Sequence, residues 1–484
     1  MKLVDALRTQ NTVTENGMTT NSSSLNACVD LFFTIGAMRG QDKQRLISNF
    51  SSAFSEDPNR ALKILFWARD VRGGAGERQV FKDILSYLAE ANLPVLQKNI
   101  HLIPEFGRWD DLLQLEGTPA EKSAFSLIQK GLEEKNGLCA KWMPRKGEEA
   151  AKLRAFLGLA PKQYRKLIVG LTDVVETKMC SKDWESIEYG KIPSLASARY
   201  QKAFWKNDQG RYQLYVEKLK SGTEKINASA VYPYDVTKSL STGVKDVAMQ
   251  QWKSLPNYME GAEERILPVV DVSGSMGCPA GGNKNLSCMD VAISLGLYIS
   301  ERNEGSFKDS FVTFSGSPQL QYLKGDLFAR FNQLRTADWA MNTDLLKVFE
   351  LILSQAKKLN VPESEMPTKI LILSDMEFDA ATRAGTTYSA WGGGSYKISE
   401  WNPTAQEMIR TMYEEAGYKM PSIIYWNIQS RGNNIPVSFD ATGTALISGF
   451  SPSILKSVVR GEIISPEQIM DQTILSERYF QISI

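Results

Sequence analysis

The sequence is poor in histidine, with His101 as the single one among 484 residues. A zinc centre built on imidazoles needs two or three histidines, and a Ser-His-Asp or Cys-His site needs one beside its nucleophile. Carboxylate pairs of the kind that hydrolyse glycosides cannot be placed from the sequence alone. We therefore expect a protein that is not an enzyme, and a triad built on His101 is the open alternative.

Cysteine is also sparse, and its five positions are scattered: Cys28, Cys139, Cys180, Cys278 and Cys288. An odd number without regular spacing does not indicate a disulfide framework, which favours a reducing compartment. Cys278 and Cys288 flank a Gly/Asn-rich insert and could meet across it. Our favoured interpretation is that they are ordinary loop thiols.

The sequence further lacks a secretory leader, a long apolar run and a charge imbalance. The first 24 residues are polar, and no apolar stretch approaches the roughly 20 residues that cross a bilayer. Hydrophobic residues make up 43%, charged residues 23%, and the net charge is +1, all ordinary for a globular protein. We expect a cytoplasmic protein with no membrane partner.

Two hydrophobic periodicities divide the chain. From Leu25 to about Trp252 apolar residues recur at helical spacing, and Pro and Gly break this region into many short helices. From Glu264 onward apolar runs alternate with helical patterns, which predicts a doubly wound, mostly parallel sheet. The expected organisation is a polar arm (1–24), an all-α solenoid of the HEAT kind (25–252), a join (253–263) and an α/β domain (264–484). The expected strands are Ile266–Val270, Ser310–Phe314, Gln319–Leu323, Lys369–Leu373, Ser422–Asn427 and Thr444–Ser448.

Polar oxygens follow the first of these strands. The buried run Ile266–Val270 leads directly into Asp271, Ser273 and Ser275, which alternate through a tight loop before the next helix. Ligand sites in open α/β sheets gather at the carboxyl ends of the strands. A carboxylate with two hydroxyls suits a small hard cation, Mg²⁺ first, with Mn²⁺ or Ca²⁺ as alternatives.

The pattern Asp-x-Ser-x-Ser resembles the metal-ion-dependent adhesion site (MIDAS) of von Willebrand factor A domains. That family adds a threonine from a later loop and an aspartate that closes a later buried strand, which the resemblance places at Thr343 and Asp375. It implies that Ser273, Ser275 and Thr343 hold the cation through hydroxyls, with Asp271 and Asp375 one shell out through water. The alternative is a set of strand-to-helix turns capped by Ser and Asp, with no metal.

Two stretches of the helical region carry a second resemblance. They are Phe66–Arg78 (FWARDVRGGAGER) and Ile103–Leu113 (IPEFGRWDDLL). Together with the metal-site domain behind them they resemble the Ro-type, TROVE-like proteins, and within that architecture the branch found in phages, fungi and plants. The resemblance implies a ring of HEAT-like helices closed by the A domain. It also implies RNA binding, because the ring of characterised relatives binds the ends of small noncoding or misfolded RNAs and its outer face binds structured RNA.

Positive charge is concentrated in the second half of the helical region. Between Lys135 and Lys225 there are nineteen Lys and Arg against ten Asp and Glu, which would attract backbone phosphates. The candidate RNA contacts are cations near aromatic residues or glycines: Arg69, Arg72, Arg78, Lys141, Arg145, Lys146, Lys202 and Lys206. The alternative is that the aromatic residues are core and the cations a solvated face, with Gly73–Gly76 a helix-ending turn.

These observations predict a Ro-like ribonucleoprotein scaffold. Its helical region would bind small or structured RNA, and its A domain would bind a divalent cation that docks a partner. The first alternative is a metal-dependent protein–protein adaptor, for example for an AAA+ ATPase or viral assembly, that does not bind RNA. The second is a structural or virion-associated protein in which the site is a relic that only stabilises the fold.

Overall fold

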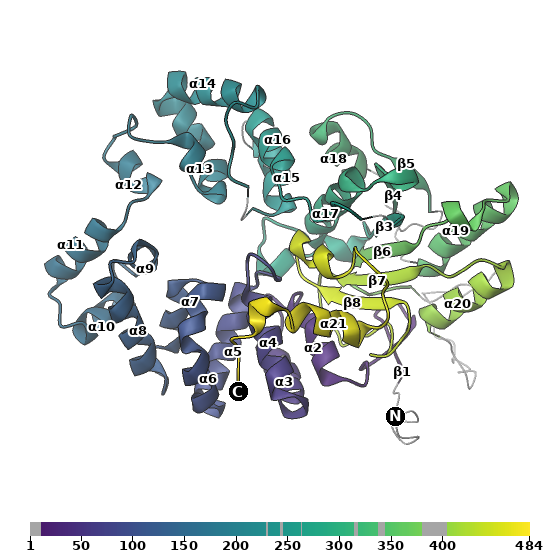
Figure 1. The fold of residues 1–484 in the computed structure, drawn as a ribbon, viewed down its shortest axis with the longest axis horizontal. Coiled ribbons are helices and arrows are strands. Elements are labelled where there is room, and N and C mark those ends of the chain that lie inside the picture. Colours follow the sequence, from purple (N-terminus) through teal and green to yellow (C-terminus); the bar gives the residue numbers. More distant parts are fainter. Residues whose placement is uncertain are drawn as a thin grey trace, which may run out of the picture. The chain divides into compact units, whose positions relative to one another are not determined.

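The computed structural model describes residues 11–228, 231–242, 245–262, 264–313, 318–336, 344–379 and 404–484. The chain forms two compact units, each discontinuous in sequence (Figure 1). Unit 1 is drawn from Met1–Asp42, Ser51–Asp57 and Asn257–Leu475, and unit 2 from Lys43–Phe50, Pro58–Pro256 and Ser476–Ile484. Among the described helices, none combines the length and apolar character needed to cross a bilayer.

Unit 1 is built on a six-stranded sheet with the order β5-β4-β3-β6-β7-β8. The strands are β3 (Ile266–Val270), β4 (Ser310–Thr313), β5 (Leu320–Tyr322), β6 (Lys369–Ser374), β7 (Ser422–Asn427) and β8 (Thr444–Ser448). Neighbours from β4 to β8 are parallel, and β5 is an antiparallel edge strand. The predicted combination of an α region with an α/β region is confirmed, and each expected strand is present to within one residue at either end.

Unit 1 also contains the helices α2 (Ala27–Ile35), α17 (Cys288–Arg302), α18 (Leu327–Arg335), α19 (Leu345–Leu359), α20 (Ala405–Ala416) and α21 (Pro466–Ile474). Helices α2, α17 and α21 contact strands of the sheet, α18 contacts α17, and α19 contacts α20. Every residue of β3, β6 and β8 is buried, which explains their continuous apolar sequence. At the crossing of α17 over β3, a Cβ on Gly296 would lie 2.5 Å from Cγ2 of Val270. Glycine thus permits the close approach of this helix to the central strand.

The N-terminal segment is a structural part of unit 1. Strands β1 (Asn11–Val13) and β2 (Thr19–Asn21) form an antiparallel pair, and the Asn21 N–H donates to the carbonyl of Ile435 at 3.1 Å. Helix α2 packs on β7 and β8. The expected division placed an arm at 1–24 and helix α2 in the all-α region. The structure instead places the described part of this arm, and α2, with the sheet.

The described residues of unit 2 form helices joined by turns and loops, with no strand among them. Its α-helices are α4 (Pro58–Arg69), α5 (Arg78–Ala91), α6 (Leu93–Asn99), α7 (Ile103–Phe106), α8 (Glu121–Glu133), α9 (Gly137–Trp142), α10 (Glu148–Phe156), α11 (Pro161–Leu171), α12 (Val175–Cys180), α13 (Ser194–Asn207), α14 (Gln209–Lys220), α15 (Pro233–Thr242) and α16 (Lys245–Lys253). Helix α3 (Lys43–Glu56) contributes its first part to unit 2 and its last part to unit 1. Consecutive helices pair, as α4 with α5, α13 with α14 and α15 with α16.

The last nine residues also belong to unit 2, although the expected division placed them with the sheet. The Arg478 guanidinium pairs with the buried Asp70 carboxylate, and the Tyr479 hydroxyl donates to the same carboxylate at 3.1 Å. The Tyr479 ring stacks on Phe106 with centroids 5.5 Å apart. Helix α21 therefore belongs to unit 1, and the short 3₁₀ turn that follows it, Glu477–Tyr479, belongs to unit 2.

Candidate functional site

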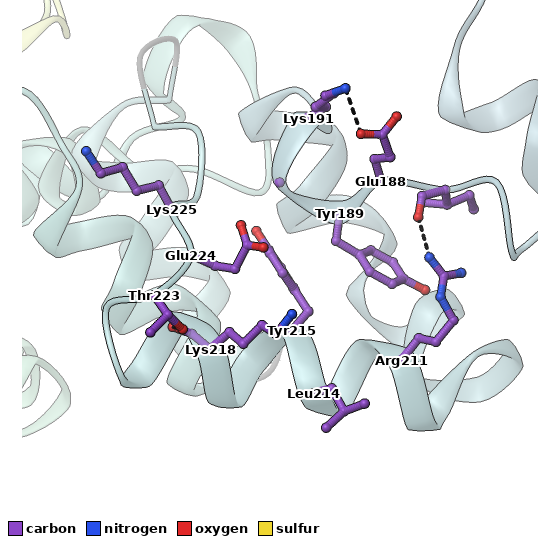
Figure 2. Close-up of a pocket in the computed structure, with 12 residues that line it drawn as sticks. Glu188, Tyr189, Lys191, Arg211, Leu214, Tyr215, Lys218, Thr223, Glu224 and Lys225 are labelled. Atoms are coloured by element: carbon purple, nitrogen blue, oxygen red, sulfur yellow. Dashed lines mark hydrogen bonds and ion pairs between the residues drawn. The ribbon is translucent and has the colours of Figure 1, made fainter.

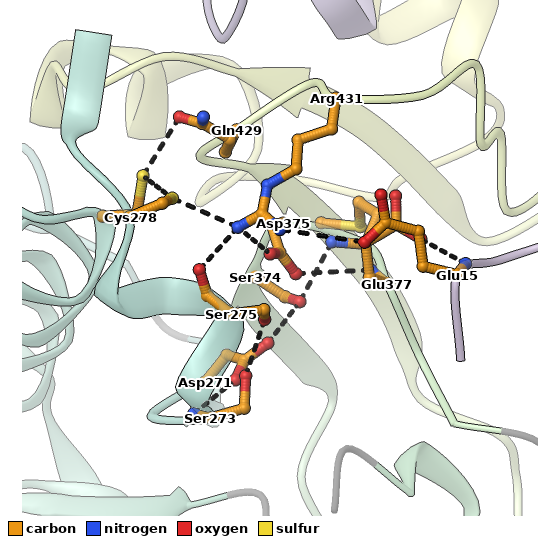
Figure 3. Close-up of polar contacts among 12 residues, drawn as sticks. Glu15, Asp271, Ser273, Ser275, Cys278, Ser374, Asp375, Glu377, Gln429 and Arg431 are labelled. Atoms are coloured by element: carbon orange, nitrogen blue, oxygen red, sulfur yellow. Dashed lines mark hydrogen bonds and ion pairs between the residues drawn. The ribbon is translucent and has the colours of Figure 1, made fainter. Parts of the chain in front are cut away.

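The site begins at the carboxyl ends of β3 and β6. These strands are parallel neighbours with Val270 opposite Leu373, so Asp271 and Asp375 emerge at the same edge of the sheet. The Asp271 carboxylate is fully buried; Oδ1 accepts from the Ser273 N–H at 2.9 Å and Oδ2 from the Ser374 hydroxyl at 2.6 Å (Figure 3). The strand register and these two hydrogen bonds hold the carboxylate in one orientation.

The two serines of the loop turn their hydroxyls toward each other. A 3₁₀ turn over Gly274–Gly277 follows Ser273, and Oγ of Ser273 lies 3.0 Å from Oγ of Ser275. Adjacent ligands of an octahedral Mg²⁺, each at about 2.0–2.1 Å, are separated by about 2.9 Å. The spacing of the two hydroxyls therefore fits one edge of such a coordination sphere.

Asp375 supplies a second buried carboxylate with one oxygen poorly satisfied. Oδ1 accepts from the Glu377 N–H at 3.3 Å. Oδ2 has no aligned hydrogen bond and lies 3.2 Å from Nη2 of Arg431. A buried carboxylate oxygen with only an ion-pair contact is the kind of group that a cation would satisfy.

Both aspartates are difficult to ionise in this environment. Burial, reinforced by the nearby Asp375 charge, raises the pKa of Asp271 to about 7. Burial also raises the pKa of Asp375, against the opposing effects of Arg431 and the Ser275 hydroxyl. Charge in this pocket is thus incompletely balanced by the protein's own groups.

Arg431 is the described cation that pairs with Asp375, and the sequence patterns did not identify it. Its Nη2 donates to the carbonyl of Ser275 and to Sγ of Cys278, the latter at 3.1 Å, while Nη1 lies 3.8 Å from a Glu15 carboxylate oxygen. Arg431 lies far along the chain in a loop after β7, so no local sequence pattern marks it. An arginine against Asp375 means that a divalent cation would share or replace this contact.

The N-terminal segment also reaches the site. The Glu377 carboxylate accepts from the Glu15 N–H at 2.7 Å and from the Asn434 amide at 2.7 Å. The Thr14 hydroxyl donates to the carbonyl of Phe378. These bonds connect residues 14–16 to the segment that follows Asp375, which periodicity within either segment could not reveal.

A thiol pair adjoins the same loop. Sγ of Cys278 lies 3.3 Å from Sγ of Cys288, and the Cys288 thiol is 3.1 Å from the amide oxygen of Gln429. The contact with Cys288, together with Arg431, lowers the pKa of Cys278 to about 6, whereas the contact with Cys278 and burial raise the pKa of Cys288. The two cysteines therefore meet across the insert as free thiols, whereas the favoured interpretation of the sequence was that they are ordinary loop thiols.

Thr343, the expected third hydroxyl ligand, lies outside the described residues. Its neighbour Asp344 caps α19, accepting from the Leu346 N–H at 3.1 Å. Of the five expected ligands, the structure thus places four, all at one edge of the sheet. Within the described ranges no group of three His, Cys, Asp or Glu side chains is placed to hold a metal ion. The candidate site at this sheet edge combines two carboxylates with serine hydroxyls instead.

The candidate RNA residues differ in their surroundings. Arg69 is 2% exposed and its Nε pairs with Asp111 at 2.7 Å, so its guanidinium is not presented to solvent in this structure. Arg78 is partly exposed and pairs with Asp110 and Asp111. The Lys141 ammonium lies 5.4 Å from the Trp142 ring centroid, which Arg108 covers at 3.7 Å. The remaining candidates are exposed: Arg72, Arg145, Lys146, Lys202 and Lys206.

A pocket of about 770 Å³ lies in unit 2 beside helix α14 (Figure 2). Its lining includes two tyrosines, four cations and two carboxylates: Tyr189, Tyr215, Lys191, Arg211, Lys218, Lys225, Glu188 and Glu224. Lys191 pairs with Glu188 at 2.7 Å, and Arg211 donates to the backbone carbonyls of Trp184 and Ile187. Lys218 and Lys225 form no ion pair with any described residue and could receive an anion.

Comparisons with known proteins divide the chain at residue 265. A family model described as a domain of unknown function, DUF2828, matches residues 14–126 and 144–265, and a second, DUF7788, matches residues 265–478. The chain is 28% identical over 518 residues to "Uncharacterized protein L728" of Acanthamoeba polyphaga mimivirus, covering 94% of this chain and 86% of the viral protein. The chain is therefore similar to this viral protein along nearly its whole length, and to two domains of unknown function in succession.

Proposed function

We propose that unit 1 is a divalent-cation-dependent docking module of the von Willebrand factor A kind. The observation that carries the proposal is the pair of hydroxyls, Ser273 and Ser275, 3.0 Å apart beside two buried carboxylates. Ser273 and Ser275 would hold the cation directly, together with Thr343, and Asp271 and Asp375 would hold it directly or through water. Mg²⁺ is the first candidate, because every donor is an oxygen.

The chemistry of this donor set indicates the kind of partner. A bound cation with few anionic ligands supplies a strong attraction for a further anionic oxygen. The chain's own residues orient the serines, exclude water from Asp271 and keep Arg431 at the rim of the site. The corresponding ligand is an aspartate or glutamate of another protein, as in an adaptor for an assembly partner such as an AAA+ ATPase.

Calorimetric titration of the chelator-stripped full chain with Mg²⁺ and Mn²⁺ tests this proposal. Asp271→Asn and Asp375→Asn should each abolish or greatly weaken binding, because each removes a negative charge at the same edge of the sheet. Glu415→Ala is the matched control, because Glu415 is an exposed carboxylate elsewhere on unit 1. Equal heats from the wild type, both site variants and the control would contradict the proposal.

A second candidate function is RNA binding by unit 2, in the manner of a Ro-like ribonucleoprotein. It is supported by the pocket cations Lys218 and Lys225 and by the exposed face of α13, where Lys202 and Lys206 flank Trp205, itself 39% exposed. Lysines beside an exposed aromatic ring can combine phosphate contact with base stacking. This second candidate function includes the proposal that the helices of unit 2 form a HEAT-like ring.

Fluorescence anisotropy with structured and single-stranded RNA tests the second candidate. Charge reversal of Lys202 and Lys206 to Glu should weaken binding, and affinity should fall steeply with salt. The same reversal at Lys357 and Lys358, exposed on α19 of unit 1, provides the control. If the chain does not bind RNA at low salt, this face is not an RNA-binding surface. The same conclusion follows if RNA binding is unchanged by charge reversal on α13 and at Arg145 and Lys146.

A further inference from the structure

Cys278 and Cys288 occupy opposite positions in a short hairpin. Pro279 and Ser287 form an antiparallel bridge, and the Cys288 N–H donates to the carbonyl of Cys278 at 3.0 Å. Residues opposite each other in an antiparallel pair have Cα atoms roughly 4.5–5.5 Å apart, within the range that a disulfide spans. Since the sulfurs are already 3.3 Å apart, side-chain rotation alone would bring them to bonding distance.

The surroundings of the two thiols are different. Cys278 is half-buried, so a small oxidant can reach it, and its sulfur accepts a hydrogen bond from the Arg431 guanidinium. Cys288 is fully buried at the start of α17, and its thiol is directed to the amide oxygen of Gln429. Cys278 is therefore placed to react first with a small oxidant, and Cys288 to resolve the product.

We propose that Cys278 and Cys288 form a peroxide-oxidisable thiol pair whose disulfide weakens cation binding at the adjacent carboxylates. The Cys278 thiolate attacks one oxygen of hydrogen peroxide, the O–O bond breaks, and hydroxide leaves with a sulfenic acid on Cys278. The Cys288 sulfur then attacks Cys278, its proton combines with the departing hydroxyl, and water leaves as the S–S bond forms. Both thiols are oxidised, and one peroxide is reduced overall.

The same guanidinium nitrogen links the thiols to the carboxylates, because Nη2 of Arg431 contacts both Cys278 and Asp375. When Cys278 is bonded to Cys288, its sulfur no longer offers this nitrogen a thiol acceptor, so Asp375 becomes the principal partner of the guanidinium. The arginine then competes more strongly with an incoming cation, and the S–S bond restrains the loop that carries Ser273 and Ser275. This regulatory part rests on the proposed function of unit 1.

Peptide mapping tests the covalent part, because trypsin cleaves after the exposed Lys284, between the two cysteines. After peroxide treatment, alkylation and digestion, the full chain should yield Ile266–Lys284 joined to Asn285–Arg302, and dithiothreitol should separate them. Cys288→Ser should abolish the cross-link, while the exposed Cys180 should still be alkylated as an internal control. Recovery of Cys278 and Cys288 as separate alkylated peptides would overturn the proposal.

Mg²⁺ titration of the reduced and oxidised chains tests the regulatory part. The dissociation constant should rise about threefold or more on oxidation and return with dithiothreitol. A cross-link that leaves the dissociation constant unchanged would overturn the regulation. Absence of Mg²⁺ binding in the reduced chain would instead overturn the proposed docking function, and the peptide map would still decide the thiol pair.

Discussion

Individual residues of the site differ in how far their own sequence surroundings reveal them. Asp271, Ser273, Ser275 and Asp375 follow buried strands, so their meeting at one sheet edge could be expected from β-periodicity and parallel topology. Arg431 could not be predicted in this way. Its contact with Asp375 joins two loops that are distant in sequence, and only the folded chain brings them together. Arg69 shows the converse: a cation that looks accessible in sequence is buried against Asp111.

The raised pKa of Asp271 predicts a pH-dependent stability in the absence of divalent cations. The folded-state pKa of about 7 exceeds the unfolded value of 3.8, so the folded chain binds this proton more tightly. The stabilisation is fully present below the unfolded pKa and is lost as pH rises through the folded pKa. The urea midpoint of the chelated protein should therefore decrease as the pH is raised from about 5 to about 8.

Asp271→Asn should reduce this pH dependence without abolishing it, because the pKa values of Asp375 and Glu377 are raised in the same direction. Saturating Mg²⁺ should raise the urea midpoint of the wild type most at the alkaline end. A variant whose midpoints follow the wild-type curve would show that Asp271 does not titrate in this range.

Removing the Arg431 charge should have opposite effects on stability and cation affinity. In Arg431→Met the buried Asp375 loses the guanidinium that pairs with it, which should cost about 3–5 kcal/mol in the chelated protein. The same change should strengthen Mg²⁺ binding, since no guanidinium competes for the carboxylate. Urea unfolding and calorimetry measure the two effects, with Arg410→Met on the exposed face of α20 as control. Weaker Mg²⁺ binding by Arg431→Met would show that the arginine supports the site.

At the scale of elements, strands were easier to predict than helix partners. Continuous apolar runs such as Ile266–Val270 and Lys369–Leu373, bounded by turn residues, indicate buried parallel strands whatever lies on either side. A mostly apolar helix such as α2 shows that it is buried but not which elements cover it, so its packing on β8 could not be predicted. The division of the chain therefore differed from the expected one where packing is long-range.

The crossing of α17 over β3 predicts a strong effect of a small substitution. Gly296→Ala places a Cβ about 2.5 Å from Val270 Cγ2, and relieving this overlap should cost about 1–3 kcal/mol. Mg²⁺ affinity should also fall, because β3 and α17 flank the loop of Ser273 and Ser275. Gly210→Ala is the control: Gly210 lies in helix α14 with open space around its Cα, and this change should be neutral or slightly stabilising. Thermal unfolding measures both, and equal midpoints for the two variants would contradict this packing account.

At the scale of the whole molecule, each unit gathers segments that are distant in sequence. The nine residues Ser476–Ile484 belong to unit 2. There the Asn99 side chain forms hydrogen bonds with the backbone of Ser483, and Arg478 forms an ion pair with Asp70. Side-chain pairs between residues nearly four hundred positions apart leave no periodic trace in sequence. Their identification required the folded chain.

Deleting Ser476–Ile484 should destabilise unit 2, although the segment follows unit 1 in the sequence. The buried Asp70 carboxylate would lose both the Arg478 guanidinium and the Tyr479 hydroxyl, at a cost of about 3–5 kcal/mol. Hydrogen exchange should show faster exchange in α4 and α7 of the truncated chain. Removal of Ile484 alone should have little effect, and unchanged exchange in the longer deletion would exclude this structural role.

The most direct test of the central claim is a crystal structure of the full chain grown with Mn²⁺, with anomalous scattering recorded. The account predicts one anomalous peak at the carboxyl ends of β3 and β6, at coordination distance from the hydroxyls of Ser273 and Ser275, with Thr343 brought to the same ion. A map without such a peak, in which the Arg431 guanidinium keeps its contacts with Ser275 and Asp375, would contradict it.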